Sequence, residues 1–125
     1  MSELSANFAS LSPLNFMERN RWVYKEKEAV VYGSRRYTYG ELSDRIQRCA
    51  AALKAAGVKK GDRVAYLVPN IPAMLEAHFA LPLLGAILVA INVRLAPDEI
   101  AYICSHSGAD ILVADCELAK SLVGQ

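Results

Sequence analysis

The sequence predicts an α/β fold, in which a parallel sheet with flanking helices follows a short helix and a β-hairpin. Three apolar segments of strand length recur in the second half of the chain, at residues 63–68, 86–91 and 110–114. A segment with helical periodicity separates each pair, which favours right-handed crossovers and a sheet covered on both sides. No internal repeat, low-complexity stretch or flexible linker divides the 125 residues, so we expect one unit.

The N-terminal third is expected to hold the short helix and the hairpin. Ser12 and Pro13 form a helix-start pair, with serine as the N-cap and proline at the first helical position. Residues 29–32 and 36–38 have strand composition and are joined by a Gly-Ser turn.

The clearest local signal is a capping box that starts the next helix. Thr38 and Glu41 stand three residues apart, so each side chain can accept a hydrogen bond from the other's backbone N–H. The helix is expected over residues 39–56, and its buried stripe is predicted to be Leu42, Ile46, Cys49, Leu53 and Ala56. Gly57 supplies a left-handed stop. Arg45 falls outside the stripe, so reversing its charge is expected to change stability by less than about 1 kcal/mol.

The helix that links the first two parallel strands is expected over residues 71–84, with Asn70 as its cap. It is apolar on nearly every face, as expected for a helix packed between layers. An internal proline costs about 3 kcal/mol, so Pro82 is expected to kink the helix or to end it early. The continuous apolar run at 86–91 predicts a strand that is buried on both faces.

The helix that links the second and third parallel strands opens at Pro97 with two acidic residues in its first turn, and Gly108 closes it. Its predicted apolar stripe consists of Ile100, Ile103 and Cys104. After the strand at 110–114, Asp115 is expected to cap a final helix.

The candidate functional edge lies where these strands end, because parallel sheets bind ligands at the carboxyl ends of their strands. Pro69 and Asn70, residues 92–95, and Asp115 occupy these positions. Asn92 and Arg94 are the best candidates for site architecture, since they follow a buried strand. Shaping of the loop is the role preferred for them over direct contact with a substrate.

Other polar residues have simpler interpretations. His78 and His106 have no Cys, His or carboxylate at metal-ligand spacing, so packing or helix-end roles are preferred. Cys49 and Cys104 lie on predicted buried stripes and are interpreted as small hydrophobic residues. Three basic residues of the turn before the first parallel strand are interpreted as solvated charges: Lys59, Lys60 and Arg63. No catalytic, cofactor-binding or metal-binding residue is assigned.

Composition disfavours several classes of protein. The formal net charge is +1 with both signs mixed along the chain, which disfavours nucleic acid and anionic membranes as partners. The three isolated cysteines and the lack of a signal peptide predict a reducing, cytoplasmic location. The most apolar stretch is shorter than the ~20 residues that cross a bilayer. An apolar content of 54% is high for a small domain, so exposed apolar faces and self-association are expected.

Three runs of the chain resemble, in order and spacing, the start of the adenylate-forming acyl-CoA synthetases, the AMP-binding ligases. They are PLNFMERN, AVVYGSRRYTYGEL and KKGDRVAYLVPNIPAMLEAHFALPLLGAILVAINVRLAPDEIAYICSHSGADILVAD. Within the family they are most similar to the acyl-activating enzymes of short- and medium-chain or related acids. The resemblance covers residues 11–125 and implies that residues 1–125 are an incomplete N-terminal part of an AMP-dependent synthetase/ligase domain.

The resemblance also implies the chemistry of the complete enzyme. That enzyme uses ATP and magnesium to convert a carboxylic acid to an acyl-adenylate with release of pyrophosphate, and coenzyme A then displaces AMP. The family's phosphate loop, adenine pocket, ribose-binding aspartate and catalytic lysine are absent from this sequence, and its seven glycines form no phosphate cradle. Ala96 and the pair Arg21 and Trp22 also depart from the family's usual residues. We therefore expect an N-terminal fragment that is inactive alone and binds no cofactor by itself.

Two other hypotheses stay open. The chain can be a natural short product that binds a full-length ligase or another partner and regulates it. It can also be an independent α/β binding module of flavodoxin or dinucleotide type, although the missing glycine fingerprint counts against this. A peroxisomal location stays open for the complete protein, because a peroxisomal targeting signal lies at the C-terminus of the complete protein. The last four residues of this sequence, Leu-Val-Gly-Gln, are not such a signal.

Overall fold

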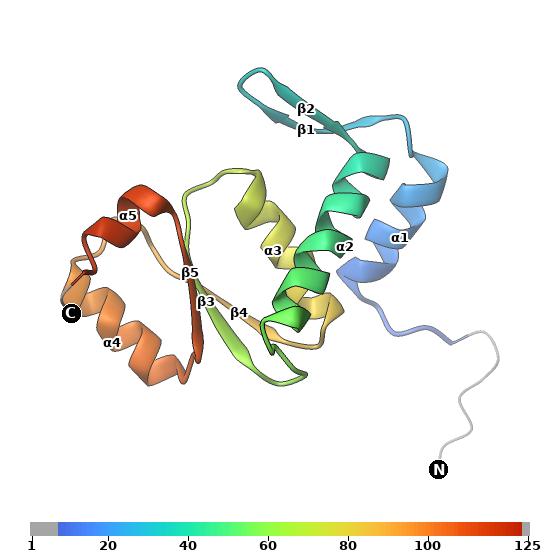
Figure 1. Cartoon of the computed structure of the whole chain (residues 1–125). Helices are drawn as coiled ribbons and strands as arrows, with labels where there is room; N and C mark the ends of the chain where they lie inside the picture. Colours follow the sequence, from blue (N-terminus) through green and yellow to red (C-terminus); the bar gives the residue numbers. More distant parts are fainter. Residues whose placement is uncertain (1–7, 124–125) are drawn as a thin grey trace, which may run out of the picture.

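A computed structural model describes residues 8–123 (Figure 1). It confirms the predicted α/β class, with a parallel sheet preceded by a helix and a hairpin. The elements in chain order are α1 (Pro13–Val23), β1 (Glu28–Tyr32), β2 (Arg35–Thr38), α2 (Tyr39–Ala55), β3 (Arg63–Leu67), α3 (Pro72–Leu83), β4 (Ile87–Ala90), α4 (Pro97–Ser107), β5 (Ile111–Ala114) and α5 (Cys116–Lys120). No helix within the described range is long and apolar enough to cross a membrane.

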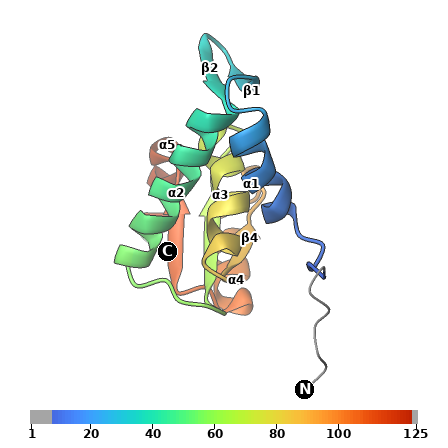
Figure 2. The same ribbon diagram turned by 90° about the vertical axis from the view of Figure 1, so that its right-hand side faces the viewer.

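The three parallel strands have the order β4-β3-β5. The chain moves from β3 to one side through α3 and then crosses back over β3 through α4. Because α3 and α4 lie on opposite faces of the sheet, the two crossovers have the same hand (Figure 1). Figure 2 shows α1, α2 and α3 stacked in front of the sheet.

Successive side chains of the central strand β3 point to opposite faces of the sheet, so they pack in two separate apolar cores. Val64 and Tyr66 face α2 and α3 and belong to the larger apolar cluster. Ala65 and Leu67 face the other way and pack with Ile100 of α4 in a smaller cluster. Each face of β3 is therefore covered, as the sequence predicts.

Most helix termini are those that the sequence predicts, since they depend on neighbours in the chain. The Ser12 side chain accepts from the Leu14 N–H at 3.2 Å. The capping box is complete, with the Glu41 N–H donating to Thr38 Oγ1 at 3.2 Å and the Thr38 N–H donating to the Glu41 carboxylate at 2.8 Å. Asp115 caps α5 through the Glu117 N–H at 3.0 Å.

Asn70 does not cap α3, and this prediction is wrong. The helix begins at Pro72, and its N-cap is Ile71, which makes no side-chain hydrogen bond. A proline disfavours helical backbone in the residue before it, so Ile71 stays extended, and this moves the start past the reach of Asn70. At the other end α3 continues through Pro82 and stops at Leu83, one residue before the expected bound, so Pro82 does not end the helix early.

Two predictions of burial are also wrong. The strand predicted over 86–91 is the edge strand β4, and 48% of Ile87 is exposed, because β3 takes the central position that covers both faces. On α2 the buried line passes through Ala50, whereas Cys49 is half-buried and Ala56 is exposed. A helix turns every 3.6 residues, so a stripe drawn at alternating spacings of four and three drifts off the buried face.

Candidate functional site

A groove of about 580 Å³ lies at the carboxyl edge of the sheet, at the upper ends of β3 and β4 in Figure 1. The residues after β3, the first half of α3 and the loop after β4 form its walls. Its lining comprises Val68, Pro69, Asn70, Met74, His78, Ala90, Ile91, Asn92, Val93 and Arg94. This is the edge at which parallel sheets bind ligands.

The groove brings together most of the positions that the sequence places at this edge. Pro69 and Asn70 from one strand end meet Asn92 and Arg94 from the next. Asp115 does not line the groove, and its side chain instead caps α5. The strand order explains this difference, since β3 lies between β4 and β5.

Asn92 and Arg94 have different surroundings within the groove. Asn92 Oδ1 accepts a hydrogen bond from the Arg94 N–H at 3.0 Å, so this side chain holds the loop after β4 in shape. The Arg94 side chain is exposed, and none of the ion pairs found within residues 8–123 involves it. Its guanidinium therefore presents its donors to solvent at the groove.

His78 is a groove residue that sequence analysis assigned to packing or a helix end. Its Nδ1 lies 2.8 Å from the Met74 carbonyl oxygen. A carbonyl can only accept, so Nδ1 carries the proton in this contact. Met74 and His78 stand four residues apart, which places them on one side of α3, and Asn70 lies four residues before Met74 in the loop that precedes the helix. That spacing, combined with the predicted strand end, is the signal that could have found His78.

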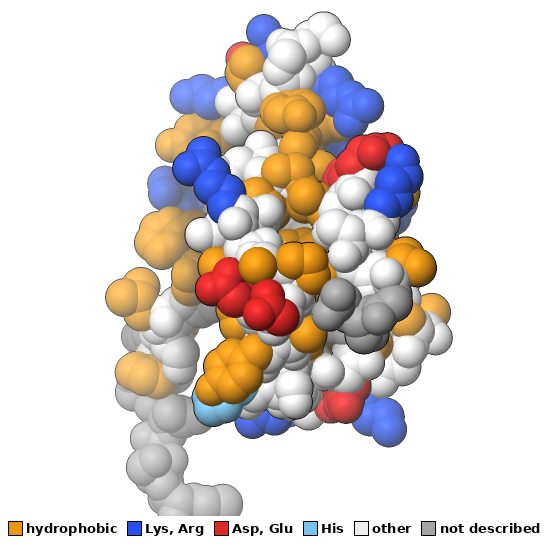
Figure 3. All heavy atoms as spheres, turned by 90° about the vertical axis from the view of Figure 1, so that its left-hand side faces the viewer, with side chains coloured by type: hydrophobic (Ala, Val, Ile, Leu, Met, Phe, Trp, Pro, Cys, Tyr) orange, Lys and Arg blue, Asp and Glu red, His pale blue; other side chains and the backbone are white. Residues whose placement is uncertain are grey.

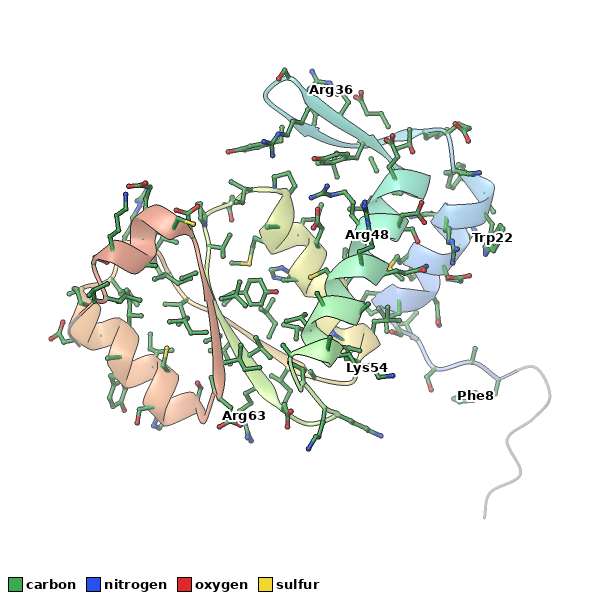
Figure 4. All side chains as sticks on the ribbon, viewed as in Figure 1. Phe8, Trp22, Arg36, Arg48, Lys54 and Arg63 are labelled. Carbon is green, nitrogen blue, oxygen red and sulfur yellow. The ribbon has the colours of Figure 1, made fainter. Side chains whose placement is uncertain are left out.

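A buried ion pair between α2 and α3 was also missed. Arg45 Nε donates to Glu76 Oε1 at 2.5 Å, and the side chains of Arg45 and Glu76 are 33% and 9% exposed. The Arg45 guanidinium also lies 4.6 Å from the centre of the Tyr37 ring. The hydrogen bond that Arg45 donates to the Glu76 carboxylate raises the pKa of Arg45. Arg45 therefore connects α2, α3 and the hairpin, and Figure 4 shows Arg48 further along the same helix.

The two half-buried cysteines agree with their interpretation as apolar residues. Cys49 Sγ lies 4.0 Å from the hydroxyl of the buried Tyr66. Burial raises the pKa of the Cys49 thiol, and burial also raises the pKa of Tyr66 above its usual range. Both groups stay protonated near neutral pH, which disfavours Cys49 as a nucleophile. Cys104 packs beside the smaller core.

The family follows from comparison with known proteins. The model of the AMP-binding enzymes matches residues 17–124, which is most of the chain. The chain belongs to this family. Its members among solved structures share both the fold and a substantial fraction of residues with it.

Relatives of this member of the AMP-binding enzymes are acyl-CoA ligases. The peroxisomal acetate/butyrate–CoA ligase of Arabidopsis thaliana is 39% identical over 117 residues, which cover 94% of this chain and 21% of the relative. The inhibitor-bound N-terminal domain of FACL13 from Mycobacterium tuberculosis has a TM-score of 0.81 at 34% identity, over 90% of this chain and 30% of that one. The chain thus spans about a fifth of the curated relative's length.

A third relative was solved with the nucleotide. O-succinylbenzoate–CoA synthetase of Bacillus subtilis, in complex with ATP and magnesium, has a TM-score of 0.81 at 30% identity, over 87% of this chain and 30% of that one. That relative therefore binds ATP and magnesium. The glycines with positive φ, at Gly33, Gly57, Gly61, Gly85 and Gly108, are separated from one another along the chain. The described part of the chain holds no group of three His, Cys, Asp or Glu residues able to bind a metal.

Proposed function

We propose that residues 1–125 are the N-terminal part of the AMP-dependent synthetase/ligase domain of a carboxylic acid–CoA ligase. The complete enzyme activates a fatty or related acid with ATP and magnesium as an acyl-adenylate and then forms the acyl-CoA thioester. The observation that carries the proposal is the match to an N-terminal ligase domain at a TM-score of 0.81 and 34% identity over 90% of this chain. The name of the Arabidopsis relative supports a carboxylic acid as the substrate class.

The carboxyl-edge groove is the part of this chain that we assign to the active-site region of the complete enzyme. Two exposed side chains there can contact a ligand, those of Arg94 and His78. No step of the reaction is assigned to either group, since the nucleotide site requires residues that this sequence does not contain.

The purified 125-residue chain is expected to form no acyl-adenylate. Its glycines form no phosphate cradle, so the triphosphate of ATP has no site in which to be oriented. Pyrophosphate release from ATP with butyrate present should equal that of a control without protein. Release well above that control would show that the chain has a catalytic site of its own.

A chimera tests the positive side of the proposal. This chain replaces the matching N-terminal segment of the Arabidopsis acetate/butyrate–CoA ligase, and acyl-CoA formation from butyrate is measured. We expect the chimera to retain ligase activity, because the two segments are 39% identical over nearly the whole chain. A chimera that is folded by circular dichroism and thermal melting but has no activity would contradict the proposal.

The observation that favours the alternative, a short regulatory product, is the apolar surface that remains exposed on the described residues. Leu83 and Ile87 lie exposed beside the β4 edge, and Leu112 lies exposed on β5 at the other edge. Figure 3 shows further apolar side chains at the surface on the side of α4 and α5. The same surface is explained by packing against the rest of a ligase, so we keep the enzyme as the main proposal. We propose a cytoplasmic location, with a peroxisomal one for the complete protein as the alternative.

The isolated chain is expected to bind the dye ANS and to self-associate. Unpaired strand edges and exposed apolar side chains are surfaces that pair with other chains. Dye fluorescence and analytical ultracentrifugation over a range of concentrations measure both effects. A dilute monomer that binds no dye and melts sharply above about 65 °C would instead identify a self-sufficient domain and favour the short-product alternative.

A further inference from the structure

A cavity of about 600 Å³ lies among α1, α2 and α3, the three helices that stack in front of the sheet in Figure 2. Its walls are mainly apolar and include Phe16 and Met17 of α1, Leu42 and Ile46 of α2, and Phe79 of α3. It shares no lining residue with the carboxyl-edge groove, so the two sites are separate. Its volume falls within the range of about 300–1,000 Å³ that is usual for small-molecule sites.

The wall of this cavity contains a buried polar side chain without a partner. Ser43 of α2 is 1% exposed, and its Oγ is the one buried side-chain nitrogen or oxygen within residues 8–123 that forms no hydrogen bond. A buried hydroxyl group without a partner destabilises a protein, and nearly all such groups in native proteins are hydrogen-bonded. Since Ser43 lines the cavity, a ligand with a hydroxyl group of its own can supply the missing hydrogen bond.

The other lining residues define the chemistry of that ligand. The polar ones besides Ser43 are half-buried, namely Ser12, Asn20 and Tyr39, and no charged side chain of the described residues lines the cavity. A carboxylate would lose its hydration there without gaining a cation, so the cavity disfavours the ionised acids that the proposed ligase activates. The cavity follows α1 from Pro13 to Asn20, a length of about 10 Å from the rise of a helix, which suits a medium-length aliphatic chain.

We propose that this cavity binds a neutral aliphatic alcohol of medium chain length. The hydroxyl group of the ligand forms a hydrogen bond with Ser43 Oγ, and its aliphatic chain packs along α1 against the apolar side chains of α2 and α3. The inference goes beyond the proposed function and does not depend on it, because the cavity and the carboxyl-edge groove have no residue in common.

Titration of the 125-residue chain with 1-octanol, followed by ligand-observed NMR, tests the inference. Binding of 1-octanol should saturate, as expected for a defined site. Octanoate, which has the same chain length, should bind about tenfold more weakly or less, because its carboxylate must be desolvated. Binding of 1-octanol that does not saturate, or octanoate that binds as tightly as 1-octanol, would overturn the inference.

Ser43→Ala tests the hydrogen bond. It should weaken the binding of 1-octanol about fivefold, the effect of one hydrogen bond. It should not lower the melting temperature of the ligand-free chain, because the Ser43 hydroxyl group forms no hydrogen bond there. The control is Ser107→Ala on α4, which removes a hydroxyl group outside the cavity and should leave the affinity for 1-octanol unchanged. An unchanged affinity in Ser43→Ala would contradict the proposed contact.

Two substitutions on α1 distinguish the cavity from other apolar surface. Phe16 and Trp22 are 55% and 70% exposed, but only Phe16 lines the cavity. Phe16→Lys should weaken the binding of 1-octanol about tenfold or more, and Trp22→Lys should leave it unchanged. Equal weakening by both would show binding to exposed apolar surface in general and would overturn the inference. A chimera that does not bind 1-octanol would also overturn it, since the remainder of the ligase would then cover the cavity.

Discussion

Replacing Arg45 by aspartate is expected to lower the free energy of unfolding by about 3 kcal/mol, the lower end of the range for breaking a buried ion pair. Glu76 is 9% exposed, and its carboxylate is bonded by the Arg45 guanidinium. The substitution removes that donor and brings a second carboxylate toward Glu76. It also removes the cation from the Tyr37 ring. The one-third exposure of Arg45 keeps the loss at the lower end of the range.

Chemical denaturation monitored by circular dichroism measures this loss, and two variants control it. Arg48→Asp makes the same change of charge on the same helix at an exposed residue that forms no ion pair within residues 8–123, and should cost less than about 1 kcal/mol. The double variant Arg45→Leu with Glu76→Leu should be more stable than Arg45→Leu alone, because it leaves no unpaired carboxylate. Equal losses from Arg45→Asp and Arg48→Asp would show that the ion pair contributes nothing.

For the charge reversal at Arg45, the sequence alone predicts a change in stability of less than about 1 kcal/mol, whereas the structure predicts a larger loss. The two predictions differ because the partner of Arg45 is distant along the chain. Helix caps such as Thr38 with Glu41 depend on residues three apart, so local chemistry suffices to find them. Arg45 and Glu76 are 31 residues apart. A pattern of helical faces assigns Arg45 to solvent, and no local signal shows which helix covers that face. Glu76 within an otherwise apolar helix was the one available hint of a buried partner.

The candidate site was partly predictable for a similar reason. Parallel strands place their carboxyl ends at one edge, so the positions of Asn70, Asn92 and Arg94 follow from the order of elements. The order of the strands within the sheet cannot be predicted from the hydrophobic periodicity of the sequence. Without it, β4 appeared to be buried on both faces, and Asp115 appeared to belong to the site. His78 was missed because a lone histidine in an apolar helix is usually a packing residue.

Replacing Leu53 by aspartate is expected to abolish the cooperative thermal transition of the isolated chain. Leu53 is 7% exposed and packs in the larger core, which includes Val58 and Val64. The change removes a buried leucine and adds a charge without a partner, a combination that costs about 4 kcal/mol or more. A small domain has about 5–15 kcal/mol of stability in total, and exposed strand edges place this chain at the low end.

Ala51→Asp provides the matched control for Leu53→Asp, because the same residue is introduced two positions earlier on the same helix at an exposed site. Its cost should stay within about 1 kcal/mol, which leaves a cooperative melt by circular dichroism. The difference between the two variants measures the buried face of α2 directly. If both variants melted alike, α2 would present a different face to the sheet. The larger core, which holds α2 and α3 against β3, would then have to be reassigned.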